Sequence, residues 1–319
     1  PKENQTADEN YKNIEKNIKE TFISLNNESI EEKKYSKQKN LENPKSNTSK
    51  DEYFEMVKKA REYIIAGDIF QVVPSQRFFT PFKISPFKLY ESLRKINPSP
   101  YMYYLDLEDF YIVGSSPETL VKTENNKITI KPIAGTRLKK KYPNRELEKE
   151  LLSDPKERAE HLMLLDLGRN DVGRVAKIGS IKVKNPFSIQ ETSNLIHIVS
   201  TVEGDLREDE DQISSLSAGF PAGTVSGAPK IRAMEIIDEL EKEKRGIYAG
   251  AVGYFSANGD MDTAIALRTA IIKDEMMYVQ AGGGVVYDSN EEYEYNETVN
   301  KSQALFKAAK DAILNNLKE

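Results

Sequence analysis

The sequence changes character near residue 51, and this change limits where a hydrophobic core can form. Residues 1–50 are rich in Lys, Glu, Asn and Ser and contain no glycine, whereas from Asp51 onward apolar runs alternate densely with Gly and Pro. A polar tract with few large apolar side chains cannot offset the entropy lost when it becomes ordered. We therefore expect residues 1–50 to be a polar, partly disordered segment or linker, and residues 51–319 to form the folded domain.

One short helix is expected within the polar segment, because apolar side chains recur there at the spacing of one helix face. They are Tyr11, Ile14, Ile18, Phe22 and Leu25. The chain begins at Pro1, and no charged-then-apolar signal segment follows. We therefore expect the chain to be a fragment of a longer protein.

The charge balance of the 319 residues disfavours partners that need a basic protein surface. The formal net charge is −5, whereas proteins that bind nucleic acid or anionic membranes usually gather a basic surplus on one face. No stretch approaches the roughly 18 consecutive apolar residues that indicate a membrane-spanning helix. The absence of cysteine excludes disulfides, thiolate metal sites and cysteine nucleophiles, and it fits a cytoplasmic location. We expect small molecules and proteins as partners, with no nucleic acid and no membrane.

Runs of expected strands are separated by helices, without the regular strand-helix alternation of a doubly wound fold. A helix around Met56 to Ile64 ends at Gly67, and further helices are expected at 86–95, 155–167, 228–243 and 290–315. Strands are expected at 69–73, 101–105, 110–113, 127–130, 250–256, 263–272 and 276–281. This order favours the α+β class.

Two expected helix starts each carry a pair of carboxylates three residues apart. Glu157 and Glu160 share one helix face near residue 155, and Glu294 and Glu297 repeat the spacing near the carboxyl end. Capping and ordinary pairing, with Lys301 one turn after Glu297, explain these residues, because acidic helix starts are common. The alternative is a hard cation such as Mg²⁺, which is usually held by one or two carboxylates with waters and substrate oxygens. The residues alone leave both interpretations open.

Several loops and isolated polar residues are candidates for ligand binding. Small residues at 134–136, 220–230 and 282–284 permit a close approach of the backbone to a ligand, although a tight turn is the ordinary explanation of each. His197 lies in an apolar run, which is typical of a core or strand residue as well as of a catalyst. Arg268 interrupts an otherwise apolar strand, so it should pair with a carboxylate of the protein or of a ligand.

Taken together, these segments resemble the chorismate-utilising enzymes, and most closely the large subunits of anthranilate synthases. The resemblance runs from about Tyr53 to Ala309, with all its motifs in one order. The motifs are GDIFQVVPSQRF (67–78), NPSPYM (97–102), GSSPE (114–118), PIAGTR (132–137), EHLM (160–163), DLGRND (166–171) and NET (296–298), together with the glycine-rich loops.

The resemblance implies an α+β fold of two β-sheets packed face to face with helices outside, and a chorismate pocket between the sheets. It implies Mg²⁺ as the cofactor, with Glu160 and Glu297 as its ligands and with Glu157 and Glu294 holding the waters of the metal. Arg268 would pair with a carboxylate of the substrate. The implied substrate-binding positions are Gln71, Gly135, Thr136, Thr224, Tyr248, Arg268, Gly282, Gly283, Gly284 and Lys301.

Two positions separate the implied activity from those of sister enzymes. Aminodeoxychorismate synthases carry a lysine nucleophile where this sequence has Ala134, so no covalent amine route is available here. Isochorismate and salicylate synthases carry a lysine that activates water where this sequence has Gln71, and an amide cannot act as that base. Both positions suit attack by ammonia, which is already a nucleophile.

The implied reaction is that of anthranilate synthase, a carbon–oxygen lyase that converts chorismate and ammonia to anthranilate and pyruvate at the first step of tryptophan biosynthesis from chorismate. In the first stage ammonia attacks C2 of the ring, and Glu118 is the expected acid for the C4 hydroxyl that leaves. In the second stage pyruvate is eliminated, with His197 as the expected proton carrier. Because glutamine hydrolysis needs a cysteine nucleophile, the ammonia is expected from a separate glutamine amidotransferase subunit.

The sequence departs from the family pattern on its amino-terminal side. Large subunits usually carry a further amino-terminal half with a Leu-Leu-Glu-Ser segment for tryptophan feedback, and we do not find it here. The other side of that regulatory site is present at Pro100, Tyr101 and Met102, but the missing Leu-Leu-Glu-Ser segment argues against feedback inhibition of this chain alone. The missing half also supplies strands, so exposed sheet edges could cause oligomers to form.

Three other functions are compatible with the sequence. The first is a sister enzyme that releases aminodeoxyisochorismate and stops before pyruvate is lost. The second is a non-catalytic regulatory module that kept the pocket, and the third is a module that holds the amidotransferase. Intact pocket residues disfavour both non-catalytic functions.

Overall fold

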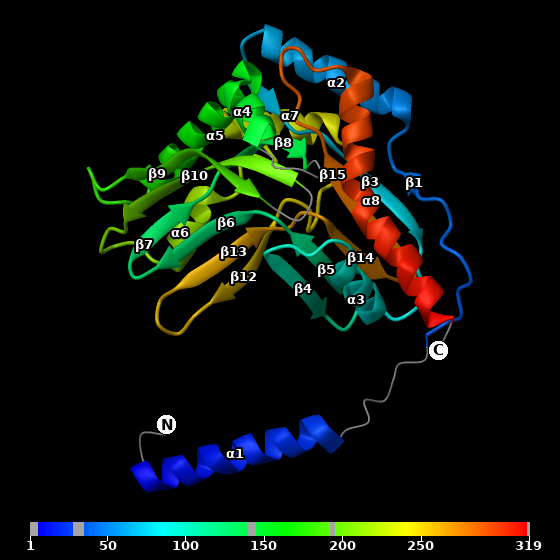
Figure 1. The fold of residues 1–319 in the computed structure, drawn as a ribbon, viewed down its shortest axis with the longest axis vertical. Coiled ribbons are helices and arrows are strands. Elements are labelled where there is room, and N and C mark those ends of the chain that lie inside the picture. Colours follow the sequence, from blue (N-terminus) through cyan, green and yellow to red (C-terminus); the bar gives the residue numbers. More distant parts are fainter. Residues whose placement is uncertain (1–5, 28–34, 140–144, 192–194, 318–319) are drawn as a thin grey trace. The chain divides into compact units, whose positions relative to one another are not determined.

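The structure is a computed structural model, in which residues 6–27, 35–139, 145–191 and 195–317 are described. The chain divides into two compact units, Pro1–Ser36 and Lys37–Glu319 (Figure 1). The first unit contains the helix α1 (Ala7–Asn27), where the sequence predicts one. Its side chains Tyr11, Ile14, Ile18 and Phe22 are exposed.

Residues 37–50, which the sequence analysis assigns to the polar segment, belong to the second unit. The strand β1 (Lys45–Ser46) pairs with β3 (Ser75–Pro81). Gln38 is buried, donates to the Pro81 carbonyl oxygen at 3.0 Å and accepts from the backbone N–H of Lys83 at 2.8 Å. Hydrogen bonds to backbone groups order this stretch, and an apolar pattern does not reveal such bonds.

The first large sheet has six strands in the order β1-β3-β15-β14-β5-β4, all paired antiparallel. Its other strands are β4 (Tyr101–Asp106), β5 (Tyr111–Ser116), β14 (Thr269–Lys273) and β15 (Met276–Gly282). The helices α3 (Pro86–Ile96) and α8 (Glu291–Asn316) pack on it and bury a cluster that includes Leu89, Val279 and Leu305.

The second large sheet has seven strands in the order β12-β13-β6-β7-β10-β8, and β9 also pairs with β10. The strands are β6 (Thr119–Glu124), β7 (Lys127–Ile130), β8 (Ile133–Leu138), β9 (Lys182–Glu191), β10 (Leu195–Asp205), β12 (Ala251–Phe255) and β13 (Met261–Ile265). The helices α5 (Pro155–Gly173) and α6 (Gln212–Gly219) cover one of its faces, and α4 (Arg145–Ser153) packs beside α5.

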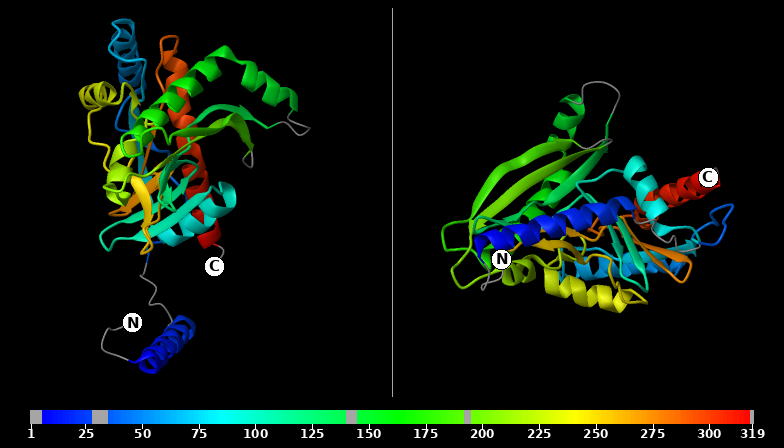
Figure 2. Two further views of the ribbon diagram at one scale, coloured as in Figure 1. Left: turned by 90° about the vertical axis from the view of Figure 1, so that its left-hand side faces the viewer. Right: turned by 90° about the horizontal axis from the view of Figure 1, so that it is seen from below.

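A third, smaller assembly joins the two large sheets at one end. The short strands β2 (Gln71–Val72) and β11 (Gly227–Ala228) pair there. The helices α2 (Lys50–Ile65) and α7 (Lys230–Leu240) share an apolar cluster with them. Figures 1 and 2 show α8 crossing one large sheet and α5 crossing the other. The expected α+β fold of two sheets with flanking helices is confirmed.

Two of the expected strands differ from the structure. The stretch 69–73 forms a strand only at Gln71–Val72, because its partner β11 has two residues. The stretch 263–272 is two strands, since the backbone turns at Arg268 with a φ of 47° and passes from the second sheet into the first. Within the described part of the chain, no helix is both long and apolar enough to cross a membrane.

Candidate active site

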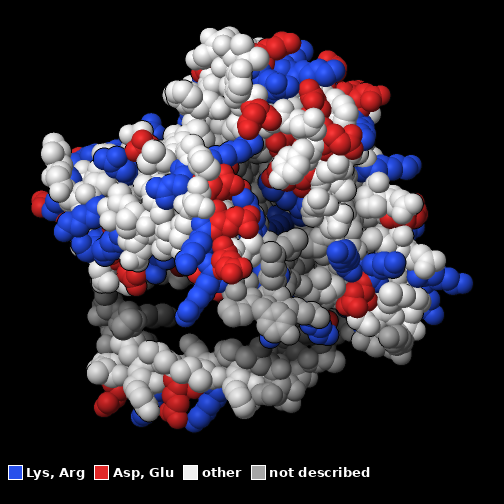
Figure 3. Space-filling model, turned by 45° about the horizontal axis from the view of Figure 1, so that its top comes forward, with Lys and Arg blue, Asp and Glu red and all other residues white. Residues whose placement is uncertain are grey.

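A cavity of about 260 Å³ lies where the two large sheets and the small assembly meet. Figure 3 shows a hollow on one face of the molecule, with acidic side chains along its border and basic ones inside it. The cavity walls come from both large sheets, from α5 and α8, and from the connecting loops. The predicted residues that line it are Gln71, Glu118, Gly135, Glu160, His197, Thr224, Tyr248, Arg268, Gly282, Glu297 and Lys301.

Glu118 lies in the connection between β5 and β6 and faces the cavity. Burial raises the pKa of its carboxyl to about 7, against the opposing effects of the Thr224 hydroxyl and of the Lys301 and Arg268 cations. A glutamic acid with this pKa is partly protonated near neutral pH. It can therefore donate a proton to a group in the cavity.

His197 owes its orientation to a bulge in the pairing of β8 with β10. His197 pairs with Thr136 and the next residue pairs with Ala134, so Gly135 is the extra residue, with a φ of +67° that favours glycine. The Gly135 carbonyl oxygen lies 3.2 Å from Nδ1 of His197. Because a carbonyl can only accept, Nδ1 carries the proton and Nε2 keeps its lone pair.

Burial also lowers the pKa of His197 below its ordinary value. The Gly135 carbonyl opposes this shift and the nearby charge of Arg268 adds to it. The imidazole is therefore neutral at neutral pH and can accept a proton at Nε2. The side chain of Thr136 lies outside the described part of the structure, so only its backbone position beside His197 is known.

Arg268 adopts the left-handed backbone conformation at the point where the chain changes sheets. Its guanidinium faces the cavity and forms no ion pair or hydrogen bond with the described residues, although the charge of Glu118 acts on it. Burial lowers the pKa of Arg268 from its ordinary value. An enclosed guanidinium with free N–H groups is suited to bind a carboxylate in bidentate fashion.

Lys301 and Glu297 lie one turn apart on α8 and form an ion pair of 2.5 Å. The ammonium of Lys301 also donates to the Gly282 carbonyl oxygen at 2.9 Å. Protein atoms surround the Lys301 side chain, yet it stays accessible because it faces the cavity. This arrangement places one cation at the border between the glycine-rich turn and the acidic residues.

The acidic residues predicted for a metal are engaged in different ways. Arg137 donates to Glu157 at 2.6 Å, and Ser289 donates to Glu294 at 2.7 Å. Glu160 forms no hydrogen bond or ion pair with the described residues. Burial raises the pKa of Glu160, and the negative charges of Glu157 and Glu297 add to the shift.

Within the described residues, no three acidic or histidine side chains are grouped in a way that could hold a metal ion. Each of Glu157, Glu294 and Glu297 is instead turned toward a cation or a hydroxyl of the protein. The other oxygen of Glu294, Oε2, is buried and has no hydrogen-bond partner in this part of the chain.

Three consecutive glycines, of which Gly282 ends β15, bring the backbone close to other parts of the site. An added Cβ at Gly282 would lie 2.9 Å from both the Tyr248 hydroxyl and the Pro74 carbonyl oxygen, and at Gly284 it would lie 2.8 Å from the Gln71 amide. Gly283 and Gly284 do not line the cavity themselves. Close packing therefore explains why Gly283 and Gly284 are glycines. Gly282 and Tyr248, by contrast, line the cavity.

Comparison of the sequence and the fold with those of known proteins identifies the family of this chain. Residues 2–307 match the family described as chorismate binding enzyme. The chain belongs to this family. It is 61% identical over 84% of its length to anthranilate synthase component 1 of Cereibacter sphaeroides, and 57% identical over 85% of its length to that of Aquifex aeolicus. The predicted family resemblance is thereby confirmed.

The chain spans about half the length of these curated relatives, 54% and 56% respectively. The crystal structure of anthranilate synthase component I from Streptococcus pneumoniae is similar in fold, with a TM-score of 0.85 and 43% sequence identity. The likeness covers 95% of this chain and 67% of that one.

The predicted regulatory residues of this chorismate binding enzyme lie away from the cavity. Tyr101 and Met102 belong to β4, the edge strand of the first sheet, and Pro100 precedes it. The Tyr101 hydroxyl bonds to Thr119 at 2.8 Å and to Asp262 at 2.9 Å. Tyr101 therefore connects the two large sheets, and its role in tryptophan binding stays a prediction.

Sequence reasoning missed two polar residues that line the cavity. Gln190 lies in β9 and Gln280 in β15. Strand alternation could have identified Gln280, because residues of β15 alternate between buried and half-buried. Gln190 had no comparable signal, since β9 itself was not predicted.

Proposed function

We propose that the chain catalyses the anthranilate synthase reaction, in which chorismate and ammonia give anthranilate, pyruvate and water. The observation that carries the proposal is the cavity, which combines a carboxyl of raised pKa, a neutral imidazole and an unpaired guanidinium. The identity to relatives named anthranilate synthase component 1 supports it.

The substrate is a dicarboxylate, and the cavity offers cations and polar groups for it. Arg268 would bind one carboxylate through its N–H groups, and Lys301 and the Tyr248 hydroxyl both lie near Gly282. Oε1 of Gln71 is buried and has no hydrogen-bond partner among the described residues. A bound ligand with a hydroxyl group would satisfy this atom.

The first stage forms the C2–N bond and breaks the C4–O bond of the ring. Glu118 in its protonated form would give its proton to the C4 hydroxyl, which leaves as water while ammonia attacks C2. The enclosed position of Glu118 matters here, because burial keeps the proton on the carboxyl near neutral pH. Gln71 occupies the position at which a hydroxylating sister enzyme carries a base that activates water. Ammonia is already a nucleophile and requires no such base.

The second stage breaks the C3–O bond to release pyruvate and removes the proton from C2, which makes the ring aromatic. His197 is the proposed proton carrier, through Nε2, since Nδ1 is held by Gly135. The departing enolpyruvyl group takes up one proton at its methylene carbon to become pyruvate. The two stages together balance one chorismate and one ammonia against anthranilate, pyruvate and water.

The acidic residues fit the Mg²⁺ that the family implies. Their donors are hard carboxylate oxygens, like charges act on Glu160, and the Glu294 oxygen Oε2 is buried without a partner. Glu160 and Glu297 would hold the ion, with Glu157 and Glu294 holding its waters. When bound, Mg²⁺ would neutralise the ring carboxylate of the substrate.

Glutamine use would require a partner of the amidotransferase class. The 319 residues contain no cysteine, and glutamine hydrolysis proceeds through a cysteine nucleophile. We propose that ammonium salts alone support product formation, and that glutamine does so only with the partner present. The cytoplasm remains the proposed location, which the absence of cysteine permits.

The test is anthranilate fluorescence after the chain is mixed with chorismate, Mg²⁺ and ammonium chloride. We expect a fluorescence signal that is lost without Mg²⁺ and lost in the Glu297→Gln variant. Lys310→Gln, at an exposed position of α8, serves as the matched control and should keep the signal. Pyruvate should appear in equal amount. Product without pyruvate would favour a sister enzyme that stops early, and absence of both chorismate binding and product would favour a non-catalytic module.

A further inference from the structure

An ion pair behind the cavity is not used by the proposed reaction. Glu241 follows α7, and Arg245 lies four residues further along the chain. The Arg245 atom Nη2 lies 2.6 Å from Oε1 of Glu241, and Nε lies 3.0 Å from Oε2. The two side chains are only 16% and 6% exposed, respectively. Such burial means that both charges have lost most of their hydration.

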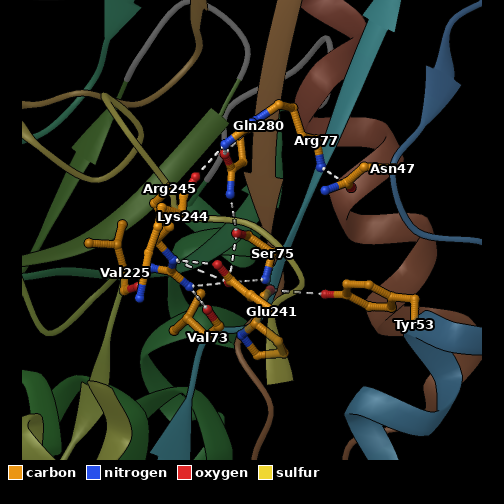
Figure 4. A network of polar contacts seen from close by, with 11 residues as sticks. Asn47, Tyr53, Val73, Ser75, Arg77, Val225, Glu241, Lys244, Arg245 and Gln280 are labelled. Carbon is orange, nitrogen blue, oxygen red and sulfur yellow. Dashed lines mark hydrogen bonds and ion pairs between the residues drawn. The ribbon is translucent and has the colours of Figure 1, made fainter. Parts of the chain in front are cut away.

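Arg245 also donates hydrogen bonds to the backbone of two segments of the cavity wall. Nη1 donates to the Val225 carbonyl oxygen at 2.7 Å, and Nη2 donates to the Val73 carbonyl oxygen at 2.6 Å (Figure 4). Val225 follows Thr224, and Val73 lies two residues after Gln71. The guanidinium also lies over the Tyr248 ring, 5.4 Å from its centre. One side chain therefore touches three segments of the cavity wall.

Glu241 extends the same network to a fourth segment. Its Oε1 accepts from both the backbone N–H and the hydroxyl of Ser75, each at 2.8 Å. The Ser75 hydroxyl in turn accepts from the amide of Gln280 at 2.8 Å, and Gln280 lines the cavity. Figure 4 shows the chain of contacts running from Arg245 through Glu241 and Ser75 to Gln280.

A role in stability alone does not account for this arrangement. Well-packed apolar side chains often stabilise a core as well as a buried ion pair does. What apolar side chains cannot supply is a rigid fork that fixes two carbonyl groups far apart in the sequence. The carbonyls held here adjoin Gln71 and Thr224, which both line the cavity, and Oε1 of Gln71 is buried without a partner among the described residues.

We propose that Glu241 and Arg245 are positioning residues that hold the segments around Gln71 and Thr224 in register across the cavity, so that their side chains meet the substrate. The inference rests on the proposed function for the identity of that substrate. Neither residue reaches the cavity itself. Their effect on the reaction passes through Val73, Val225 and Tyr248.

The variants Arg245→Lys and Glu241→Gln test the proposal with little change in volume. An ammonium keeps the charge but cannot hold two carbonyls and a carboxylate at once. An amide at position 241 can still accept from Ser75 but loses the ion pair. Arg232→Met is the matched control, because Arg232 on α7 pairs with Asp68 and Glu235 at the surface.

In the wild type and each variant, anthranilate formation is measured against chorismate concentration with Mg²⁺ and ammonium chloride. Both test variants should raise the KM for chorismate about 10- to 100-fold, as expected for small misplacements of binding groups, while Arg232→Met leaves it unchanged. A third variant, Arg245→Ala, removes the whole guanidinium side chain and should also raise the KM. Added guanidinium ion at millimolar concentration should lower the raised KM of Arg245→Ala but not that of Glu241→Gln. A purely structural role would reduce the folded fraction without changing KM.

Backbone hydrogen exchange gives a second readout that does not depend on activity. Exchange should increase at 71–75 and 222–228 in both test variants and stay unchanged in α3. Folded variants with wild-type KM and wild-type exchange would overturn the positioning role, and so would failure of both test variants to fold. A wild-type chain that makes no anthranilate would overturn the proposed function instead, and exchange would then decide the positioning role alone.

Discussion

Three ionisable side chains in the cavity differ in charge because their surroundings differ. Glu118 is enclosed and partly protonated near neutral pH, whereas His197 is held neutral by burial and by the charge of Arg268. Arg268 stays cationic, since a guanidinium keeps its proton throughout the physiological range. A carboxyl of raised pKa, a neutral imidazole and a guanidinium cation thus coexist in one cavity.

The protonation of Glu118 predicts a pH dependence. Its pKa of about 7 lies above the ordinary value, so the acid form is present below that pH and is lost as the pH rises through it. We expect kcat/KM for chorismate, expressed per concentration of free ammonia, to fall above about pH 7. Glu118→Gln should lack this limb and be about 10²- to 10⁴-fold slower. The same falling limb in the variant would show that another group titrates.

Several residues of the site could be found from the sequence, and others could not. Glu118, His197 and Arg268 were found because their motifs or their apolar surroundings mark them. The pairing of Glu157 with Arg137 was not predicted, because it depends on how α5 meets β8. Arg245 was missed, since its partners lie in segments that only the fold brings together.

At the scale of the elements, the bulge between β8 and β10 sets the geometry of the site. It depends on Gly135, where an added Cβ would lie 3.0 Å from Glu157 Oε2 and 3.1 Å from Leu151 Cδ1. A side chain there is disfavoured both by the positive φ and by these contacts. The His197 hydrogen bond to the Gly135 carbonyl would move with the bulge.

Gly135→Ala is therefore expected to lower both the free energy of unfolding and the rate of anthranilate formation. Gly67→Ala is the matched control, because Gly67 also has a positive φ but no atom near its added Cβ. The control should lose about 1 kcal/mol of stability from the backbone alone and keep its activity. Urea denaturation and the fluorescence assay measure the two effects. Equal losses in both variants would refute the role of the bulge.

Most helices and half of the sheet structure could be predicted from periodicity and caps. The helix starts at Pro86 and Pro155 were found because proline marks the first turn. The sequence did not predict the strands β9 and β10 or their pairing. Most side chains of β9 are exposed, so its apolar and polar residues show little alternation. The change of sheet at Arg268 depends on tertiary contacts, which override local propensity.

At the scale of the whole molecule, the second unit contains all four apolar clusters and the cavity. The sequence did not predict that residues 37–50 fold with the second unit. Hydrogen bonds hold this stretch in place, such as the one that the Ser46 hydroxyl donates to Gln76 Oε1 at 2.6 Å. The described residues of the first unit belong to none of these clusters.

Two deletions test where the second unit begins. Removal of residues 1–36 should leave the melting temperature and the activity of the remainder unchanged. Removal of residues 1–50 should lower the melting temperature by several degrees, because it takes away β1, the Gln38 bonds and the Ser49 cap of α2. Differential scanning calorimetry measures both. Equal melting temperatures in the two deletions would place the boundary at residue 50.

The residues that line the cavity lie far apart in the sequence, and this determines when the site can form during folding. Gln71 comes well before Glu297 and Lys301 in the chain, because these two residues lie on α8. Contacts between such distant segments form slowly, because a long loop must close before they contribute any stability. A nascent chain that has completed both β8 and β10 still has no binding site. Ligand binding in the cavity would thus report the completion of folding, and a chain truncated before residue 297 would contain the strands of both large sheets but lack Glu297 and Lys301.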